Sequence, residues 1–261
     1  MTAAIRMYLM IASQYRVNLS IWLVVSVLQA VVYMSVWQAV AVANGGETGG
    51  FTSSEFAGYY LVILVIQQFV TTVSITGEFS GYVRKGTLSI LLLRPLHPFA
   101  YVLGGMLGFR IQFLLLLPPV VLVLTLGFDP TLDLRAAAVA AMVVLLPLAL
   151  LTKVMGDTML ACSSMWLTRI DGIRGMYGLV ILLMSGHLAP LALLPHTMQV
   201  IAKVLPFYWM LGFPTELLIG RADLADTWIA IGVLGAWSIG LYIVLQPLWR
   251  AGTRAYEAVG T

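Results

Sequence analysis

Six long intervals of the sequence contain no Asp, Glu, Lys or Arg, and they constrain the fold more than any other feature. They are residues 17–46, 56–77, 111–128, 136–152, 175–202 and 227–249. Each is close to or longer than the roughly 20 residues with which a helix crosses the hydrocarbon core of a bilayer. Apolar residues run continuously within them instead of alternating, which favours helices over the strands of a membrane barrel. The sequence therefore predicts an all-α polytopic membrane protein.

The composition supports the same class. Hydrophobic residues make up 61% of the 261 residues and charged residues only 10%, whereas soluble domains carry about 25% charged residues. These values argue against a soluble enzyme and a disordered chain, and the single cysteine, Cys162, argues against a disulfide scaffold. We expect one membrane domain over residues 1–261, without an attached soluble domain.

We place six membrane-spanning helices in these intervals. Their bounds are 19–43, 56–76, 100–126, 136–166, 175–194 and 227–248. The fourth is too long for one straight crossing and contains Pro147, so it should kink or continue past the bilayer face. Residues 1–17 precede the first span and place Ile5, Leu9 and Ala12 on one face, which predicts an interfacial helix; a frayed terminus is the alternative.

The distribution of Lys and Arg predicts the orientation. With the N-terminus inside, nine basic residues lie on the cytoplasmic side and three on the outer side. The protein should therefore be a multi-pass protein of the cell (inner) membrane with both termini cytoplasmic. The outer three are Arg135, Lys203 and Arg221.

Two loops stand out because they are strongly apolar. The cytoplasmic loop 77–99 is basic and rich in leucine, and residues 87–93 can form two helical turns that stop at Arg94, before Pro95. We expect Leu88, Leu91 and Leu92 to be buried there; a membrane-hugging loop held by positive charge is the alternative. The outer segment 185–226 is broken by prolines and predicts short helices that dip into the outer leaflet and return. Its aromatic residues 207–209 are typical of a membrane interface.

Charged residues within predicted spans are candidates for function. Lys153 and Asp157 are four residues apart, so they share a helix face and can pair, although both can instead reach the cytoplasmic headgroups. Arg110 lies about one-third of the way along its span, where it can snorkel or pair with Glu78 or Asp157.

Polar side chains gather in the first two spans. Interhelical hydrogen bonding explains them without a substrate, and a substrate path is the alternative. The candidates for the path are Gln29, Tyr33, Gln67, Gln68, Thr71 and Thr72.

The sequence contains no complete motif for nucleotide binding, metal binding or catalysis. The segment 81–87 has two glycines at phosphate-loop spacing but lacks the following lysine and a preceding strand. The three histidines are far apart and no zinc-binding spacing is present. Asp171-Gly-Ile-Arg174 superficially resembles the core of the CDP-alcohol phosphotransferases, but the further metal-binding aspartates are missing. We therefore expect no cofactor in this chain and no enzymatic activity of the chain by itself.

Three segments in this order carry a resemblance to a known family. They are R-K-G-T-L-S-I-L-L-L-R-P-L at 84–96, W-L-T-R-I-D-G-I-R-G-M-Y at 166–177, and the apolar proline-broken run from 185 to 220. With six spans and a cytoplasmic N-terminus, the chain resembles the permease subunit of type-2 ATP-binding cassette (ABC) exporters over nearly its whole length.

The resemblance implies a division of the chain. Residues 1–17 would be the elbow helix, 77–99 the loop that holds a coupling helix, and 185–226 the outer re-entrant helices. The coupling helix would dock on the ATPase, with Leu88 and Leu91 in an apolar groove. The implied interface residues are Arg84, Lys85, Gly86, Leu88, Leu91, Arg94 and Pro95.

The resemblance also implies the partners. These are two copies of an ABC ATPase subunit, which would carry ATP and Mg, a second permease, identical or homologous, and membrane lipid, without nucleic acid. The expected function is outward transport of an amphiphilic or lipid-like substrate. The alternative is a secondary transporter or channel that acts without ATP.

Overall fold

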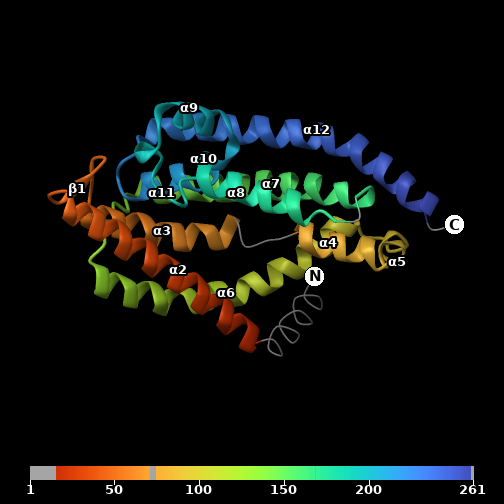
Figure 1. The fold of residues 1–261 in the computed structure, drawn as a ribbon, viewed down its shortest axis with the longest axis horizontal. Helices are drawn as coiled ribbons and strands as arrows, with labels where there is room; N and C mark the ends of the chain where they lie inside the picture. The colour runs from red at the N-terminus through yellow and green to blue at the C-terminus, as the bar shows by residue number, and fades with distance from the viewer. Residues whose placement is uncertain (1–15, 71–74, 168, 260–261) are drawn as a thin grey trace.

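The computed structural model describes residues 16–70, 75–167 and 169–259, and nearly all of them are helical (Figure 1). The long helices are α2 (Arg16–Ala43), α3 (Ser53–Val70), α6 (Pro98–Phe128), α7 (Ala136–Cys162) and α12 (Thr227–Val259). The short ones are α4 (Ile75–Arg84), α5 (Leu88–Leu92), α8 (Asp171–Met184), α9 (His196–Val204), α10 (Pro206–Met210) and α11 (Gly212–Leu218). The 3-10 turns are η1 (Ser163–Met165), η2 (Leu191–Leu193) and η3 (Leu224–Asp226). The predicted all-α fold is confirmed, and the helix predicted over 1–17 falls mostly outside the described residues.

One small hairpin interrupts the helices. Strands β1 (Glu47–Thr48) and β2 (Phe51–Thr52) pair antiparallel between α2 and α3. Gly49 and Gly50 connect them with φ values of 58° and 80°. Two successive residues with positive φ are what a two-residue hairpin turn of this hand requires, and glycine adopts them without steric cost.

Four candidate spans are long and apolar enough to cross a membrane, and the second of them runs over residues 71–74, which the structure does not describe. They are Ile21–Ala43, Ser53–Arg84, Ala136–Met165 and Leu224–Tyr256. Helix α6, with 31 residues, covers the predicted third span. Helix α7 runs through Pro147 and is followed by η1, so the two elements cover nearly all of the predicted fourth span.

The predicted fifth span, 175–194, is wrong in its extent. Helix α8 begins at Asp171 and ends at Met184 after 14 residues, which is about 21 Å at 1.5 Å per residue and shorter than a core of about 30 Å. The chain leaves the helix because Gly186 has a φ of 81° and Pro190 follows. The uncharged interval continues past this point because the residues after the turn are also apolar. Some of them form the 3-10 turn η2 instead of extending α8.

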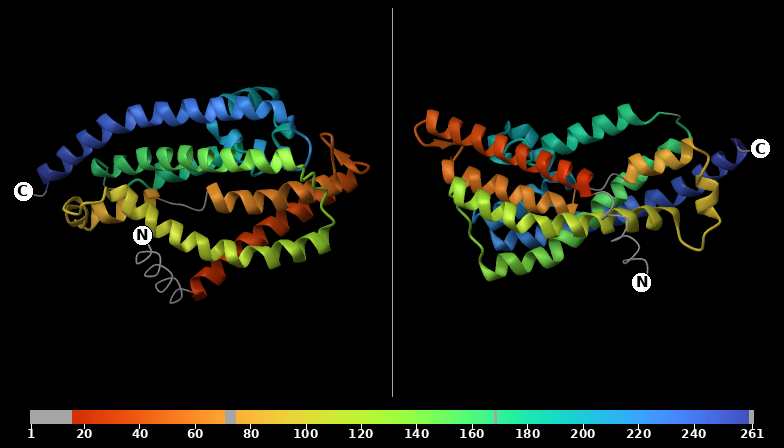
Figure 2. Two further views of the ribbon diagram at one scale, coloured as in Figure 1. Left: turned by 180° about the vertical axis from the view of Figure 1, so that it is seen from behind. Right: turned by 90° about the horizontal axis from the view of Figure 1, so that it is seen from below.

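Helix α3 lies at the centre of the bundle. It contacts α2, α6, α7 and α11, and 13 of its 18 residues are buried. Helices α7 and α12 run side by side, while α2 and α6 lie on the other side of α3 in Figure 1 and in the left view of Figure 2. A helix that is apolar all round is expected at the core of a bundle, and α3 matches this description.

The two ends of the bundle differ. The β hairpin and the short helices α9, α10 and α11 gather at one end, here called the hairpin end (Figure 1). Helices α4 and α5 and the C-terminal part of α12 lie at the opposite end, here called the α5 end (Figures 1 and 2). The loop 77–99 and the segment 185–226 are thus on opposite ends, as the sequence predicts.

Candidate functional site

The basic loop folds as a short helix at the α5 end. Helix α5 spans Leu88–Leu92, and the backbone N–H of Arg94 donates to the carbonyl of Leu91 at 3.2 Å, so the helical turns stop before Pro95. Gly86, with a φ of 70°, makes the turn between α4 and α5. The predicted helix over 87–93 is confirmed to within one residue at each end.

The apolar side chains of residues 88–93 divide between the inside and the outside of the protein. Leu88 and Leu91 are 0% and 5% exposed, while Ile90 and Leu93 are 57% and 88% exposed. The expectation that Leu88 and Leu91 fill a groove of another subunit therefore does not fit this chain, because its own helices already cover them. Their burial itself is confirmed, and Leu92 is half-buried.

A separate hydrophobic cluster anchors α5. Leu88 and Leu91 pack with Phe79 of α4, Phe99 of α6 and Cys162 of α7. The ring of Phe99 stacks on Phe79 at 4.5 Å between centroids and meets Trp249 of α12 at 4.9 Å. A displacement of α5 therefore acts directly on residues of four other helices.

His97 lies at the edge of this cluster, just before α6. Its ring is 4.8 Å from that of Trp249 and 5.5 Å from that of Phe99. Partial burial beside these rings lowers the pKa of His97, because desolvation disfavours the imidazolium. The neutral form therefore prevails at this position over a wider pH range.

The other predicted interface residues are on the surface. Arg84, Lys85, Gly86, Arg94 and Pro95 are all exposed. The Arg94 guanidinium lies 5.0 Å from the centre of the Tyr101 ring. Within the part of the chain that the structure describes, no carboxylate pairs with Arg84, Lys85 or Arg94. These cations are free to meet acidic groups of another molecule.

The two charges predicted on α7 do pair. The Lys153 ammonium donates to both carboxylate oxygens of Asp157, at 2.6 and 2.5 Å, and the two side chains are only 7% and 5% exposed. This burial does not fit the alternative in which both reach the headgroups. The backbone carbonyl of Asp157 also accepts from the hydroxyl of Thr76 at 3.0 Å, which connects α7 to α4.

Arg110 has a different environment from the one predicted. It is 6% exposed, and its Nη1 donates to the backbone carbonyl of Phe69. It forms no ion pair with Glu78 or Asp157, so the predicted pairing is wrong. The Phe69 carbonyl can accept a hydrogen bond from the guanidinium because α6 contacts α3.

Hydrogen bonds fasten the turn after α8 at the hairpin end. The hydroxyls of Tyr59 and Tyr60 donate to the carbonyls of Gly186 and Leu188, both at 2.8 Å. Trp37 of α2 also donates to the Leu188 carbonyl, at 3.1 Å. Three side chains of α2 and α3 thus hold one turn of the outer segment.

The short helices predicted in segment 185–226 are confirmed, but the placement of their aromatic residues at an interface is wrong. Phe207, Tyr208 and Trp209 are 9%, 6% and 7% exposed. They are buried because α10 packs against α7, α11 and α12. The hydroxyl of Tyr208 donates to the Glu216 carboxylate at 2.7 Å, which satisfies a buried polar group.

The described candidates for the path differ in their surroundings. Gln29 is exposed on α2, whereas Gln67 and Gln68 are buried inside the bundle on α3. Tyr33 stacks on Tyr60 with 5.3 Å between ring centres, near the hairpin end. Thr71 and Thr72 lie outside the described residues.

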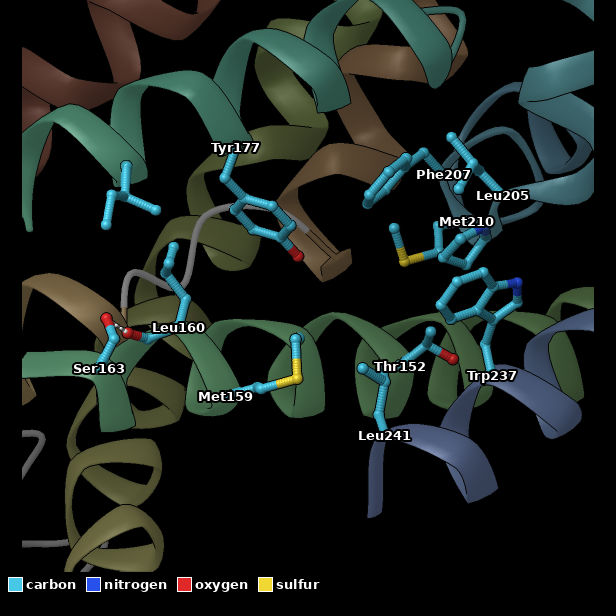
Figure 3. A pocket seen from close by; sticks show the side chains of 13 residues that line it. Thr152, Met159, Leu160, Ser163, Tyr177, Leu205, Phe207, Met210, Trp237 and Leu241 are labelled. Atoms are coloured by element: carbon cyan, nitrogen blue, oxygen red, sulfur yellow. Dashed lines mark hydrogen bonds between the residues drawn. The ribbon is translucent and has the colours of Figure 1, made fainter. Parts of the chain in front are cut away.

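Sequence reasoning missed a pocket between α7, α8, α10 and α12 (Figure 3). Its volume is about 360 Å³, and its walls include Met159, Leu160, Tyr177, Phe207 and Trp237. These residues come from four helices that are far apart in the sequence. No local pattern could bring them together, because each is an ordinary apolar residue of its own helix.

The fold and these sites define a class: a multi-pass helical membrane protein with an anchored short helix at one end and broken short helices at the other. Residues 27–260 match the family described as ABC-2 family transporter protein. Since this covers most of the chain, the protein belongs to that family and is the membrane component, or permease, of an ABC transporter. Comparison with curated proteins and with solved structures gives no match.

Proposed function

We propose that the chain is the permease of an ATP-driven exporter that moves an amphiphilic or lipid-like substrate outward. The observation that carries this proposal is the two-sided packing of α5. Leu88 and Leu91 fix the helix to the bundle, while Ile90 and Leu93 face outward beside exposed cations. An anchored helix with an exposed apolar face and free cations suits a docking partner that must transmit force.

The partner would be an ABC ATPase subunit in two copies, which would hold ATP and Mg. Family membership supports this partner, because ABC-2 permeases work with ABC ATPases. Arg84, Lys85 and Arg94 would meet acidic groups on it, and Leu93 would replace Leu88 and Leu91 as the apolar contact. A second permease, identical or homologous, would form the other half of the complex.

The described contacts support a route for coupling. A ligand shifts a conformational equilibrium only through its different affinity for the two states, so the energy would come from tighter ATP binding to the closed ATPase pair. Closure would displace α5. The packing of Phe79, Phe99 and Trp249 would pass this displacement to α4, α6 and α12. In this arrangement the α5 end and both termini are cytoplasmic and the hairpin end faces outward.

Co-purification tests the docking surface. The tagged chain is extracted from its native membrane in mild detergent, and an associated ATPase is identified by its nucleotide-binding sequence. Leu93→Asp and Arg84→Glu should each reduce the recovered ATPase by about tenfold or more, since tenfold corresponds to only about 1.4 kcal/mol of contact energy. Leu134→Asp is the matched control, because Leu134 is 59% exposed at the hairpin end.

Two results would contradict the proposal. Undiminished recovery of the ATPase with both Leu93→Asp and Arg84→Glu would place the docking surface elsewhere. Movement of a fluorescent phospholipid across liposomes that contain the purified chain alone, without ATP, would favour an ATP-independent transporter or channel.

A further inference from the structure

The pocket between α7, α8, α10 and α12 has no part in the coupling route described above. Its volume of about 360 Å³ falls in the range of about 300–1,000 Å³ that is usual for small-ligand sites. Figure 3 shows Leu160 and Met159 on α7, Tyr177 on α8, and Trp237 and Leu241 on α12 around one space.

The polar atoms of the pocket wall are almost all used by the protein itself. The Thr152 hydroxyl donates to the Leu148 carbonyl at 2.9 Å, and the Ser163 hydroxyl donates to the Leu160 carbonyl at 2.6 Å. The indole N–H of Trp237 donates to the carbonyl of Val204 at 3.0 Å. A ligand in this pocket therefore meets carbon and sulfur over nearly its whole length.

Tyr177 is the exception. Within the described residues its hydroxyl makes no hydrogen bond, and Figure 3 shows it directed from α8 toward α7. A Cβ at Gly156 would lie only 2.6 Å from this hydroxyl, so the glycine is what allows Tyr177 to approach α7. The pocket thus offers a single uncommitted polar group.

The nearly apolar wall of the pocket determines which kind of molecule can bind there. A polar solute would leave its donors and acceptors unpaired against this wall, which is costly. Ordered water needs two to four polar partners, and the wall supplies one. A hydrocarbon chain needs none, and a bilayer surrounds these helices with such chains.

Helix α8, which forms one wall of the pocket, lies on the outside of the bundle. None of the described residues of α8 is buried, and Ile173, at the edge of the pocket, is 44% exposed. We propose that the pocket binds one acyl chain of a membrane phospholipid, with the Tyr177 hydroxyl donating to an ester carbonyl of that lipid. The inference concerns this chain alone and does not rest on the proposed export function.

Photolabelling tests the site directly. The full-length protein is placed in phosphatidylcholine nanodiscs that contain a trace of phosphatidylcholine with a diazirine in one acyl chain. After irradiation, mass spectrometry should locate the adducts on Met159, Leu160 and Leu241, in preference to exposed lipid-facing residues of α2. Since this map uses the unaltered protein, it tests the proposal whether or not any variant folds.

Filling the pocket should remove the label. Leu241→Trp should lower labelling at Met159 by at least about tenfold, because every methylene kept out of the pocket loses its transfer free energy. Leu241→Phe should give a smaller loss. Val244→Trp is the matched control on the same helix, since Val244 is 52% exposed and lies outside the pocket wall. Tyr177→Phe should lower labelling several-fold through the lost hydrogen bond.

Three results would overturn the proposal. One is labelling spread evenly over exposed helix faces. Another is labelling of Met159 that neither Leu241 variant changes. The third is a crosslink at Leu241→Cys that joins two copies of the chain and excludes the lipid label, which would assign the pocket to a second permease.

Discussion

The two ends of the bundle are held together by different kinds of interaction. At the hairpin end, the hydroxyls of Tyr59 and Tyr60 donate to the backbone carbonyls of Gly186 and Leu188, both at 2.8 Å. At the α5 end, aromatic rings and leucines pack around Phe99, 4.5 Å from the ring of Phe79 and 4.9 Å from that of Trp249. Side-chain hydrogen bonds are added to apolar packing at the hairpin end, whereas the described contacts of Leu88 and Leu91 at the α5 end are apolar.

Backbone continuity explains the difference. The chain of the outer segment is divided into short helices, so many of its N–H and C=O groups lie outside helices and need other partners. At the α5 end, most backbone groups of α6, α7 and α12 are paired within long helices, and only side chains remain to be packed. Apolar packing is non-directional, so it can hold α5 while permitting small shifts, whereas the hydrogen-bonded turn has one geometry.

The largest expected effect comes from removing volume at the α5 end. Leu88→Ala deletes a fully buried side chain and should lower the free energy of unfolding by about 2–5 kcal/mol. Thermal unfolding of the purified protein in detergent measures this. Leu93→Ala is the matched control, since Leu93 is 88% exposed, and it should change stability by at most about 0.5 kcal/mol. Equal effects of the two variants would contradict the division of α5 into an anchored and a free side.

Removing a hydrogen bond at the hairpin end should have the next largest effect. Tyr59→Phe keeps the buried ring but leaves the Gly186 carbonyl without its donor, at a cost of about 1–3 kcal/mol. Hydrogen exchange at residues 185–190 should speed up in this variant and stay unchanged at α5. Tyr242→Phe, at a tyrosine that is 52% exposed on α12, controls for loss of a hydroxyl elsewhere. Uniformly faster exchange would contradict a local role for Tyr59.

A smaller effect is expected where the β hairpin meets the outer segment. Arg221 donates to the Gly50 carbonyl at 2.7 Å and to Glu55 at 2.8 Å, and its guanidinium lies 3.9 Å from the centre of the Phe51 ring. Lysine keeps the charge, but it cannot stack on the Phe51 ring and should keep a hydrogen bond to only one of the two acceptors. Arg221→Lys should therefore lower the free energy of unfolding by about 1 kcal/mol. Limited proteolysis within residues 44–52 measures the loosening.

The exposed pair of Arg135 and Asp133 provides the control for that substitution. Its side chains are 56% and 39% exposed, and such surface pairs contribute about 0–1 kcal/mol. Arg135→Lys should therefore leave the cleavage pattern unchanged. A matching change in both variants would mean that the loosening does not depend on the contact of Arg221 with Phe51 and Gly50.

Local patterns in the sequence predict the fold better than they predict the sites. Five of the six uncharged intervals coincide with the long helices α2, α3, α6, α7 and α12, and Pro95 predicts the end of α5, because both signals are local. The burial of Leu88 depends on Phe79, Phe99 and Cys162, which belong to other helices. The wrong placement of residues 207–209 has the same cause, since an aromatic run looks alike at a bilayer interface and in a core. The pocket depends on four helices and has no local signal at all.

The smallest expected effect is a pH dependence of stability that arises at the α5 end and not at the hairpin end. Burial lowers the pKa of His97, so between that lowered value and the usual value of about 6.5 the unfolded chain binds more protons than the folded chain. Stability should therefore rise with pH across this window and be lost as the pH falls through it. Between pH 7.5 and 5.5, His97→Gln should remove about 1 °C of the decrease in Tm that the unaltered protein shows.

The control for this pH experiment is at the other end. His196→Gln, at an exposed position at the start of α9, leaves His97 and its ring contacts in place and should keep the full decrease in Tm. If His97→Gln shows the same decrease, protonation at the α5 end does not weaken the packing around Trp249. The apolar packing at this end would then tolerate an imidazolium at its edge. The contrast between the two ends would be supported only by the Leu88→Ala and Tyr59→Phe variants.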